Sequence, residues 1–186
     1  MRDNELSAES SPLPGVGEGQ GEGAPAQPRV VPTIRLEPVT HDNWRAVIAL
    51  EIAEDQRAFL DSESMVHALA EMQFYPDFKA YAVTDGDIMV GFVSHGRSSE
   101  RPNIWWIPLI VIDRRHQHKG YGRAVMEAVI DYVRREAPDC TSIGLKYKPA
   151  NEVARRLYAS LGFVETDEFD EEGNVRAWLE LGRGAI

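Results

Sequence analysis

Apolar residues recur at every second position in several short stretches of the chain, a pattern typical of half-buried strands. The first stretch starts at Thr33, and two later ones flank Asp85-Gly86, a dipeptide favoured in tight hairpin turns. Two other stretches are apolar almost without interruption, which is typical of buried strands. The sequence therefore predicts strands over residues 33–37, 79–84, 88–95, 103–112, 142–147, 163–165 and 175–181.

Helical spacing of apolar residues predicts four helices among these strands. The clearest covers residues 122–136, where apolar side chains recur every three or four positions. Because this helix separates two buried strands, we expect those strands to pair in parallel through a crossover connection. The other helices are expected after His41-Asp42-Asn43 and on through Asp55, after Asp61 or Ser62, and over 151–160.

Residues 1–32 differ in composition from the rest of the chain. They contain alternating glycines between positions 15 and 23, several prolines and no aromatic residue. Such a segment cannot bury enough apolar surface to offset the entropy lost on ordering. We therefore expect a disordered tail over 1–32 that takes no part in catalysis, and one folded domain over 33–186.

Composition and charge narrow the class of protein. A chain of 186 residues with a formal net charge of −10 suits one domain whose average surface repels nucleic-acid phosphates. Cys140 is the only cysteine, which excludes an intramolecular disulfide and a cysteine-rich zinc site, and no metal is expected. No apolar run approaches the roughly 18 residues of a membrane-spanning helix, and the first ten residues lack the apolar core of a signal peptide. We expect a cytoplasmic protein without a membrane anchor.

The segment 111–124, VIDRRHQHKGYGRA, holds the clearest chemical signal. An apolar strand runs into a turn with Gly120 and Gly122, and an amphipathic helix begins at once. Glycines let the backbone approach a ligand, and the N–H groups at a helix start attract phosphate. Four basic residues add to this preference in an otherwise acidic chain: Arg114, Arg115, Lys119 and Arg123. We therefore predict that this loop binds phosphate.

Two motifs resemble the signatures of the GNAT superfamily of N-acetyltransferases. The nucleotide-binding patterns G-x-G-x-x-G and G-x-x-x-x-G-K-[ST] are absent, whereas Gln117-x-x-Gly120-x-Gly122 resembles the GNAT loop that binds the pyrophosphate of coenzyme A. The stretch NEVARRLYASLGF, from Asn151 to Phe163, resembles the second signature at the expected distance. The resemblance covers the chain from about Thr33 to its C-terminus.

The resemblance implies the GNAT fold, a mixed α+β domain whose mostly antiparallel sheet of six to seven strands is flanked by about four helices. It also implies acetyl-CoA as cosubstrate, entering where the sheet is splayed between its fourth and fifth strands. Pro108 suits such a splay because it cannot donate a ladder hydrogen bond. The cofactor-binding residues that the resemblance implies are Leu109, Ile110, Val111, Ile112, Gln117, His118, Lys119, Gly120, Tyr121, Gly122, Arg123, Ala124, Asn151 and Arg155.

Tyr158 resembles the general acid of this family, which donates a proton to the departing thiolate of coenzyme A. A phenol suits this role because its ordinary pKa lies close to that of a thiol. The alternative is a packing aromatic on the last helix. Asn151 resembles the residue that binds the pantetheine arm, but it also makes a good helix N-cap.

Within the superfamily the chain most resembles bacterial diamine and polyamine N-acetyltransferases, so the expected acceptor is a small primary amine. The substrate-binding candidates are Glu51, Glu54 and Asp55, one face of the first predicted helix, together with Trp106. An exposed acidic helix face is the alternative interpretation of the three carboxylates. Residues 167–172 are expected to form a solvated turn.

Other acceptors and one other class of protein stay open at this point. An aminoglycoside-like antibiotic or a protein amino group could take the acetyl group, or the domain could bind acetyl-CoA without catalysis. Cys140 is expected to be an inert small hydrophobe, which favours direct attack of the amine over an acetyl-cysteine enzyme. No nucleic-acid or membrane partner is expected, a homodimer is left open, and the general base is not identified.

Overall fold

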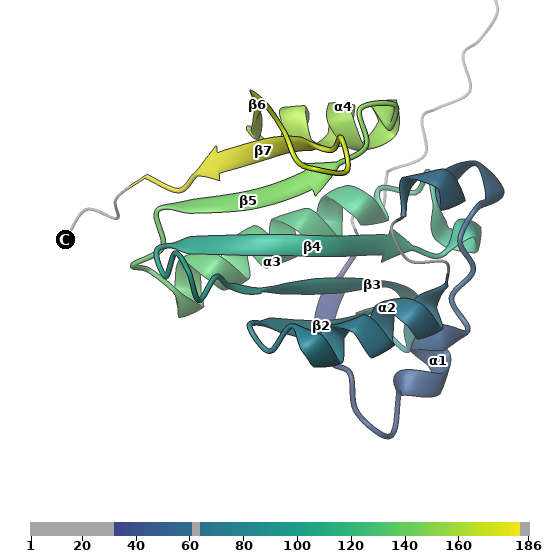
Figure 1. The fold of residues 1–186 in the computed structure, drawn as a ribbon. Coiled ribbons are helices and arrows are strands. Elements are labelled where there is room, and N and C mark those ends of the chain that lie inside the picture. Colours follow the sequence, from purple (N-terminus) through teal and green to yellow (C-terminus); the bar gives the residue numbers. More distant parts are fainter. Residues whose placement is uncertain (1–31, 61–63, 183–186) are drawn as a thin grey trace, which may run out of the picture. The chain divides into compact units, whose positions relative to one another are not determined.

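The structure is a computed structural model and describes residues 32–60 and 64–182. In this part of the chain, seven strands form one sheet in the order β1-β2-β3-β4-β5-β7-β6 (Figure 1). Neighbouring strands are antiparallel except β4 and β5, which are parallel as predicted. The strands are β1 (Ile34–Pro38), β2 (Phe78–Asp85), β3 (Ile88–Arg97), β4 (Ile104–Ile112), β5 (Ser142–Tyr147), β6 (Val164–Phe169) and β7 (Val175–Glu180). The tail expected over 1–32 lies almost wholly outside the described residues and stays a prediction.

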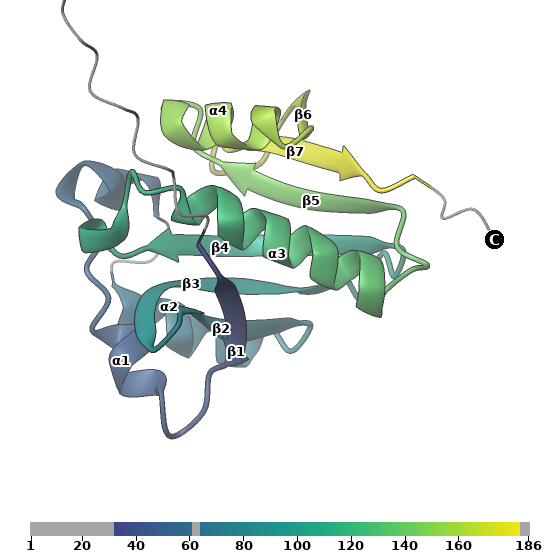
Figure 2. The same ribbon diagram turned by 180° about the vertical axis from the view of Figure 1, so that it is seen from behind.

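Helices cover both faces of this sheet (Figures 1 and 2). The α-helices are α1 (Trp44–Ile48), α2 (Met65–Glu71), α3 (Tyr121–Glu136) and α4 (Glu152–Ser160), and the 3₁₀ segments are η1 (Glu54–Phe59), η2 (Met72–Phe74) and η3 (Arg114–His116). α1 and α2 lie on one face and α3 on the other. The predicted fold class, a mixed and mostly antiparallel sheet flanked by helices, is confirmed. No helix in 32–60 or 64–182 is long and apolar enough to cross a membrane.

Two apolar cores hold the helices on the sheet. The larger core joins α3 and α4 to the sheet, and three fully buried valines, Val125, Val129 and Val133, lie on one face of α3. Burying each such side chain contributes about 1.5–3 kcal/mol, which explains why this helix follows its apolar spacing so closely. The smaller core joins α1 and α2 to the opposite face around Phe92 and Val111. The two cores therefore hold β3 and β4 from both faces of the sheet, next to the cavity between β4 and β5.

The sheet splays between β4 and β5, its fourth and fifth strands. Their parallel ladder ends with Ile107 opposite Leu145. Pro108 comes next in β4 and has no N–H to donate. β4 continues to Ile112 as the partner of β3 alone. The splay predicted for this fold therefore begins at the proline.

The first predicted helix, expected to run on through Asp55, is wrong in its extent. α1 ends at Ile48, and the chain then forms a short connection before η1. The reason is a tertiary contact at Glu51: its N–H donates to Asp113 Oδ2 (3.0 Å), and its carbonyl accepts from the N–H of Arg114 (2.8 Å). These bonds use the main-chain groups that a longer helix would need.

The second helix, α2, begins at Met65, slightly later than the predicted start after Asp61 or Ser62. Ser64 is its N-cap, and the Ser64 hydroxyl accepts a hydrogen bond from the N–H of His67 (3.3 Å). The predicted starts, Asp61 and Ser62, lie outside the described residues. Met65, which the pattern placed in the core, is buried.

Candidate active site

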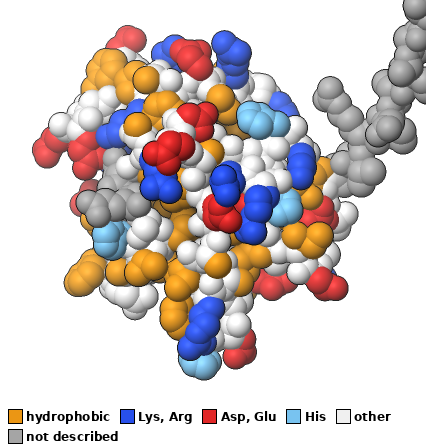
Figure 3. Space-filling view, turned by 90° about the vertical axis from the view of Figure 1, so that its right-hand side faces the viewer, with side chains coloured by type: hydrophobic (Ala, Val, Ile, Leu, Met, Phe, Trp, Pro, Cys, Tyr) orange, Lys and Arg blue, Asp and Glu red, His pale blue; other side chains and the backbone are white. Residues whose placement is uncertain are grey.

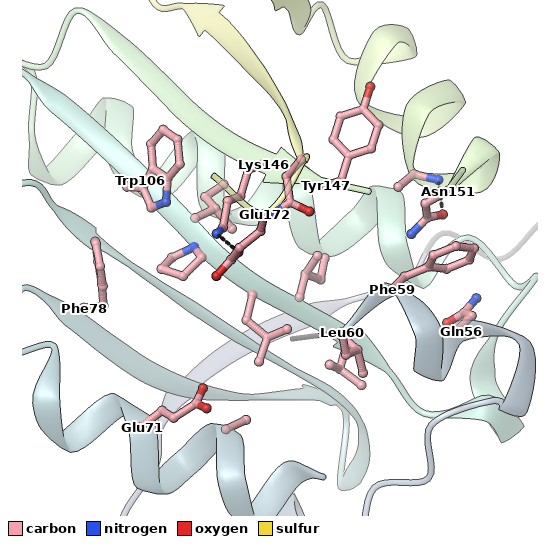
Figure 4. A pocket seen from close by; sticks show the side chains of 18 of the residues that line it. Gln56, Phe59, Leu60, Glu71, Phe78, Trp106, Lys146, Tyr147, Asn151 and Glu172 are labelled. Atoms are coloured by element: carbon pink, nitrogen blue, oxygen red, sulfur yellow. Dashed lines mark hydrogen bonds and ion pairs between the residues drawn. The ribbon is translucent and has the colours of Figure 1, made fainter. Parts of the chain in front are cut away.

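A cavity of about 500 Å³ opens where β4 and β5 diverge (Figure 4). Residues 106–111 of β4 form one wall, and Lys146 and Tyr147 of β5 form the opposite one. Residues of α4, η1 and α2 and of the connection between β6 and β7 also line it. Segments distant in sequence thus meet at the splay, which makes this cavity the natural place for a ligand of the domain.

The β4 wall combines apolar side chains with an exposed strand edge. Trp106, Leu109, Ile110 and Val111 line the cavity, whereas Ile112 pairs with β3 and packs against the core below α3. Because the ladder with β5 ends before Pro108, the main chain beyond it turns its second edge toward the cavity. Such an edge can pair with amide groups of a bound ligand.

Tyr158 brings a phenol to the cavity from α4. The residue is only 7% exposed, and its ring packs against the rings of Tyr147 (centroids 5.4 Å apart) and Phe163 (5.9 Å). Burial, with a smaller contribution from Tyr147, raises the pKa of Tyr158 well above its ordinary value. The phenol is therefore neutral at physiological pH and keeps a proton that it can donate.

Asn151 lies at the start of α4 and also lines the cavity (Figure 4). Its Oδ1 accepts a hydrogen bond from the N–H of Ala154 (3.0 Å), so it caps the helix as the sequence allowed. The cap uses only the carbonyl oxygen of the amide. The Nδ2 group remains as the donor that a ligand in the cavity could use.

The loop before α3 has a backbone that leaves N–H groups for a ligand. Gly120 is left-handed (φ 88°) and serves as the N-cap of α3, and His118 is also left-handed (φ 61°). The N–H of Ala124 is the first to bond back, donating to the carbonyl of Gly120 (3.1 Å). The N–H groups of residues 121–123 therefore have no acceptor within the helix and lie at its positive end.

His118 is the one residue other than glycine with a positive φ in the described part of the chain. A side chain there meets an unfavourable backbone conformation, and histidine is among the residues that tolerate it better than most. The constraint at this position therefore lies in the dihedral angle of the main chain.

Buried polar contacts hold the loop in place. The fully buried carboxylate of Asp113 accepts hydrogen bonds from the N–H, Nε and Nη2 of Arg115 and from the N–H of Glu51. The side-chain hydrogen bonds from Arg115 outweigh burial and hold the pKa of Asp113 well below its ordinary value. Gln117 Nε2 donates to Gln56 Oε1 (2.9 Å), which ties the loop to η1. The loop is thus preorganised.

Side chains on both sides of the helix start fasten α3 to its surroundings. The hydroxyl of Tyr121 donates to Asp85 Oδ2 (2.8 Å) at the hairpin between β2 and β3. A Cβ at Gly122 would touch Leu157 of α4 at 3.4 Å, an ordinary packing distance. A Cβ would thus fit beside α4, so the packing of α3 against α4 does not require a glycine at 122, whose effect is to leave the main chain accessible.

Basic side chains gather on the face of the molecule that carries this loop, mixed with acidic ones (Figure 3). Arg114 pairs with Glu51, and Arg123 pairs with Glu127 (3.2 Å). Lys119 Nζ donates to the main-chain carbonyl of residue 115 (2.8 Å). The arginines are therefore partly neutralised, and the main-chain N–H groups carry much of the anion preference.

Comparison with known proteins decides the family. Residues 40–163 match the acetyltransferase (GNAT) family, which is more than half of the chain and contains both motifs. The chain belongs to the GNAT acetyltransferase family. The cavity at the splay and the loop before α3 are thus parts of a GNAT acetyltransferase domain.

Individual relatives of this GNAT domain include polyamine and aminoglycoside acetyltransferases. The spermine/spermidine N(1)-acetyltransferase of Bacillus subtilis is 29% identical over 155 residues, which are 80% of this chain and 99% of the relative. The spermidine N-acetyltransferase of Vibrio cholerae, solved with CoA and spermine, has a TM-score of 0.63 at 19% identity and covers 81% of this chain and 96% of its own. An aminoglycoside acetyltransferase solved with coenzyme A has a TM-score of 0.68 at 14% identity over 80% of this chain and 95% of its own. These two structures support the fold.

The acidic wall predicted on the first helix does not form in this GNAT domain. Glu51 pairs with Arg114, and Glu54 pairs with Arg57 (3.1 Å) around a separate hollow. Asp55 is exposed, and none of the three carboxylates lines the cavity at the splay. The shared face disappears because the chain leaves the helix at Ile48.

Two other predicted site residues have different surroundings. Trp106 lines the cavity, and its ring packs against Trp178 with centroids 5.4 Å apart. Arg155 points its guanidinium to Glu165 (2.9 Å) and Glu152 (3.0 Å) and is not part of the cavity lining. Trp106 is thus placed to contact a ligand, whereas Arg155 is engaged with carboxylates of α4 and β6.

The cavity contains charged residues that the sequence did not single out. Glu71, Lys146 and Glu172 line it, and Asp170 lies behind them. The predicted solvated turn over 167–172 is wrong in two respects: residues 167–169 belong to β6, and the side chain of Asp170 is only 12% exposed. An Asp followed by Glu-Glu-Gly-Asn signals an Asp-capped turn, but its position at the cavity depends on tertiary packing. In the described part of the chain no group of three or more His, Cys, Asp or Glu is arranged to hold a metal ion.

Proposed function

We propose that this GNAT acetyltransferase transfers the acetyl group of acetyl-CoA to a primary amine of a small diamine or polyamine by direct attack in a ternary complex. One observation carries the proposal: Tyr158 and Asn151 line a single cavity together with the unpaired edge of β4 and two carboxylates. Relatives named for spermine and spermidine acetylation, at 29% identity, support the choice of acceptor.

Acetyl-CoA fits the loop and the adjoining cavity. Its pyrophosphate would be held by the main-chain N–H groups of residues 117–123, with the first turn closed by Ala124 and fixed by Asp113 and Gln117. The pantetheine arm would follow β4 from Ile112 to Leu109, with Asn151 Nδ2 as a side-chain donor. Arg155 would need to leave its carboxylates to take part, so we assign the pantetheine contacts to the other residues.

In the reaction, the neutral amine attacks the acetyl carbonyl and coenzyme A leaves as a thiolate that needs a proton. Tyr158 lines the cavity and holds a proton that burial makes difficult to lose in the absence of a strong acceptor. The departing thiolate is desolvated in the same cavity, which raises its affinity for a proton as well, so we assign Tyr158 as the general acid. Cys140 is buried two residues before β5 and lies outside the cavity lining, which agrees with transfer that does not pass through an acetyl-enzyme.

The charges of the cavity support a cationic acceptor. Glu71 and Glu172 line it, and the side chain of Glu172 is 56% exposed and accessible to a ligand. Carboxylates attract the ammonium groups of an amine and can accept, directly or through water, the proton that the amine must lose before attack. The acidic character predicted for the acceptor site is therefore proposed here for different residues.

A panel of amines tests the proposal, with released coenzyme A detected through its thiol. Spermine, spermidine, a diamine and a monoamine would be compared with an aminoglycoside and a lysine-containing peptide. We expect the highest kcat/KM with an aliphatic di- or polyamine. A higher kcat/KM with the aminoglycoside or the peptide would replace the proposed acceptor, and binding of acetyl-CoA without turnover of any amine would indicate a non-catalytic module.

A further inference from the structure

An ammonium group already lies in the cavity, and it belongs to the protein. Lys146 of β5 places its Nζ 2.8 Å from Glu172 Oε2 (Figure 4). The same Nζ lies 3.0 Å from Asp170 Oδ2. Both carboxylates come from the connection between β6 and β7. Charge-assisted hydrogen bonds of this kind are what a bound amine would make with the same oxygens.

The carboxylate pair, Asp170 and Glu172, is held in place by groups other than Lys146. Asp170 Oδ1 accepts from the N–H of Glu172 (3.0 Å) and of Asn174 (2.8 Å). The side-chain Nδ2 of Asn174, a residue only 2% exposed, donates to both carboxylates, at 2.9 and 3.1 Å. Gly173 closes the turn with a φ of 77°. The convergence of the two carboxylates therefore belongs to the fold of the connection.

Hydrogen bonding also keeps Asp170 and Lys146 charged. Burial would raise the pKa of Asp170, but hydrogen bonds from Asn174 and Lys146 outweigh it and hold that pKa well below its ordinary value. Burial likewise would lower the pKa of Lys146, and the hydrogen bonds to Glu172 and Asp170 more than compensate. The carboxylate pair thus stays a binding site for an ammonium ion, occupied by the lysine.

Lys146 stands between two hollows. It lines the cavity at the splay, and it also lines an adjoining hollow of about 640 Å³. The aromatic residues Tyr75, Phe78 and Trp106 line both hollows as well. An extended acceptor that reaches from the reacting end of the cavity into the second hollow would therefore pass close to the lysine ammonium.

We propose that Lys146 is a specificity-determining residue, which occupies the Asp170–Glu172 carboxylate pair with the protein's own ammonium and so favours acceptors with few positive charges over tetra-amines. The proposal rests on the proposed function, since it concerns the acceptor of the same site. Of the charged side chains that line the cavity, two are carboxylates and one is Lys146, so removal of the lysine doubles the net negative charge of the lining. It also leaves the carboxylate pair to a second ammonium of the substrate.

Lys146→Met tests the proposal because methionine keeps much of the length of the side chain and removes its charge. We expect kcat/KM for spermine to rise about tenfold or more, because a second ammonium of spermine can then form charge-assisted hydrogen bonds with the carboxylate pair. kcat/KM for a monoamine and KM for acetyl-CoA should stay within about twofold. The double variant Lys146→Met/Glu172→Gln should lose most of the gain for spermine.

Arg134→Met is the matched control, because it removes one positive charge from an exposed site on α3. The control should leave the ratio of kcat/KM for spermine to that for the monoamine unchanged. An unchanged ratio in Lys146→Met would overturn the specificity role while leaving acetyl transfer intact. If the parent enzyme acetylates no amine, the proposed function fails. Calorimetric titration with spermine then tests the role of Lys146 separately. Tighter binding by Lys146→Met than by the parent supports the role of the carboxylate pair, and equal affinities contradict it.

Discussion

At the scale of single residues, a hydrogen bond to Glu165 distinguishes one of two neighbouring buried tyrosines from the other. Tyr147 and Tyr158 both line the cavity, and their rings are in contact. The hydroxyl of Tyr147 donates to Glu165, and burial followed by this hydrogen bond raises the pKa of Tyr147 to about 12. For Tyr158 burial is the main cause of the raised pKa. The sequence motif picked out Tyr158, and the structure gives the physical reason why it retains its proton.

Tyr158→Phe should lower kcat by about 10²–10⁴-fold while acetyl-CoA affinity changes by less than about twofold. The hydroxyl acts mainly when charge develops on the departing sulfur, and the retained ring preserves contacts with Tyr147 and Phe163. Single-turnover rates measure this effect where chemistry is limiting. Tyr147→Phe, the control, should lose far less, and an undiminished rate in Tyr158→Phe would remove it as the general acid.

His95 shows what burial does to a titratable residue away from the site. It is 1% exposed, its Nδ1 accepts from Trp105 Nε1 (3.2 Å), and its ring stacks on Tyr81 with centroids 4.5 Å apart. Within the described residues its Nε2 has no hydrogen-bond partner. Burial, and next the charge of Lys79, lower the pKa of His95 from 6.5 to about 4.

The free energy of unfolding should therefore fall as the pH is lowered from about 6.5 to about 4. In this window the unfolded chain binds a proton that the folded protein does not, which costs at most about 1.4 kcal/mol per pH unit. His95→Gln keeps an acceptor for Trp105 but cannot titrate, so its unfolding free energy should depend less on pH. Urea unfolding at several pH values compares the two proteins, and parallel curves would show that His95 does not cause the loss.

At the scale of elements, the local sequence pattern predicted the structure correctly where a segment's conformation depends on its own residues. The hairpin at Gly86, the loop ahead of α3 and the strands follow the predicted pattern closely, except that β6 runs on to Phe169 beyond the predicted end at 165. The segment after Ile48 does not, because Glu51 bonds to the end of β4, and no pattern in the local sequence records that contact. The same holds for the turn at Asp170. Its shape is set by hydrogen bonds within the turn, whereas its position beside Lys146 depends on tertiary packing.

Gly120→Asp and Gly120→Asn separate charge from backbone strain in the loop before α3. Gly120 is left-handed, and a Cβ there would meet nothing within 4 Å, so both variants carry the same strain and nearly the same volume. The aspartate adds a negative charge where the pyrophosphate is proposed to bind. We expect acetyl-CoA affinity to be weaker for Asp than for Asn by about tenfold or more at similar melting temperatures. Equal affinities would place the pyrophosphate elsewhere.

At the scale of the whole molecule, the sequence predicts the sheet, the family and the loop proposed to bind the pyrophosphate, while the charged lining of the cavity emerges only in three dimensions. Pro108 marks the splay in the sequence because the lack of an N–H is a local property. The carboxylates of the cavity come from α2 and from the connection between β6 and β7, which are far apart in the chain. Their meeting depends on packing of both faces of one sheet, so helical spacing of acids alone could not pick out these carboxylates.

The central claim is direct transfer of an acetyl group from acetyl-CoA to an amine bound in the cavity between β4 and β5. Mass spectrometry of both protein and acceptor, after brief incubation with isotopically labelled acetyl-CoA and spermidine, tests it most directly. The account predicts that spermidine gains the labelled acetyl group, that the protein's mass stays unchanged at every time point, and that Tyr158→Phe forms the product far more slowly. Label trapped on the protein before it reaches the amine, or no label on any amine, would contradict the account.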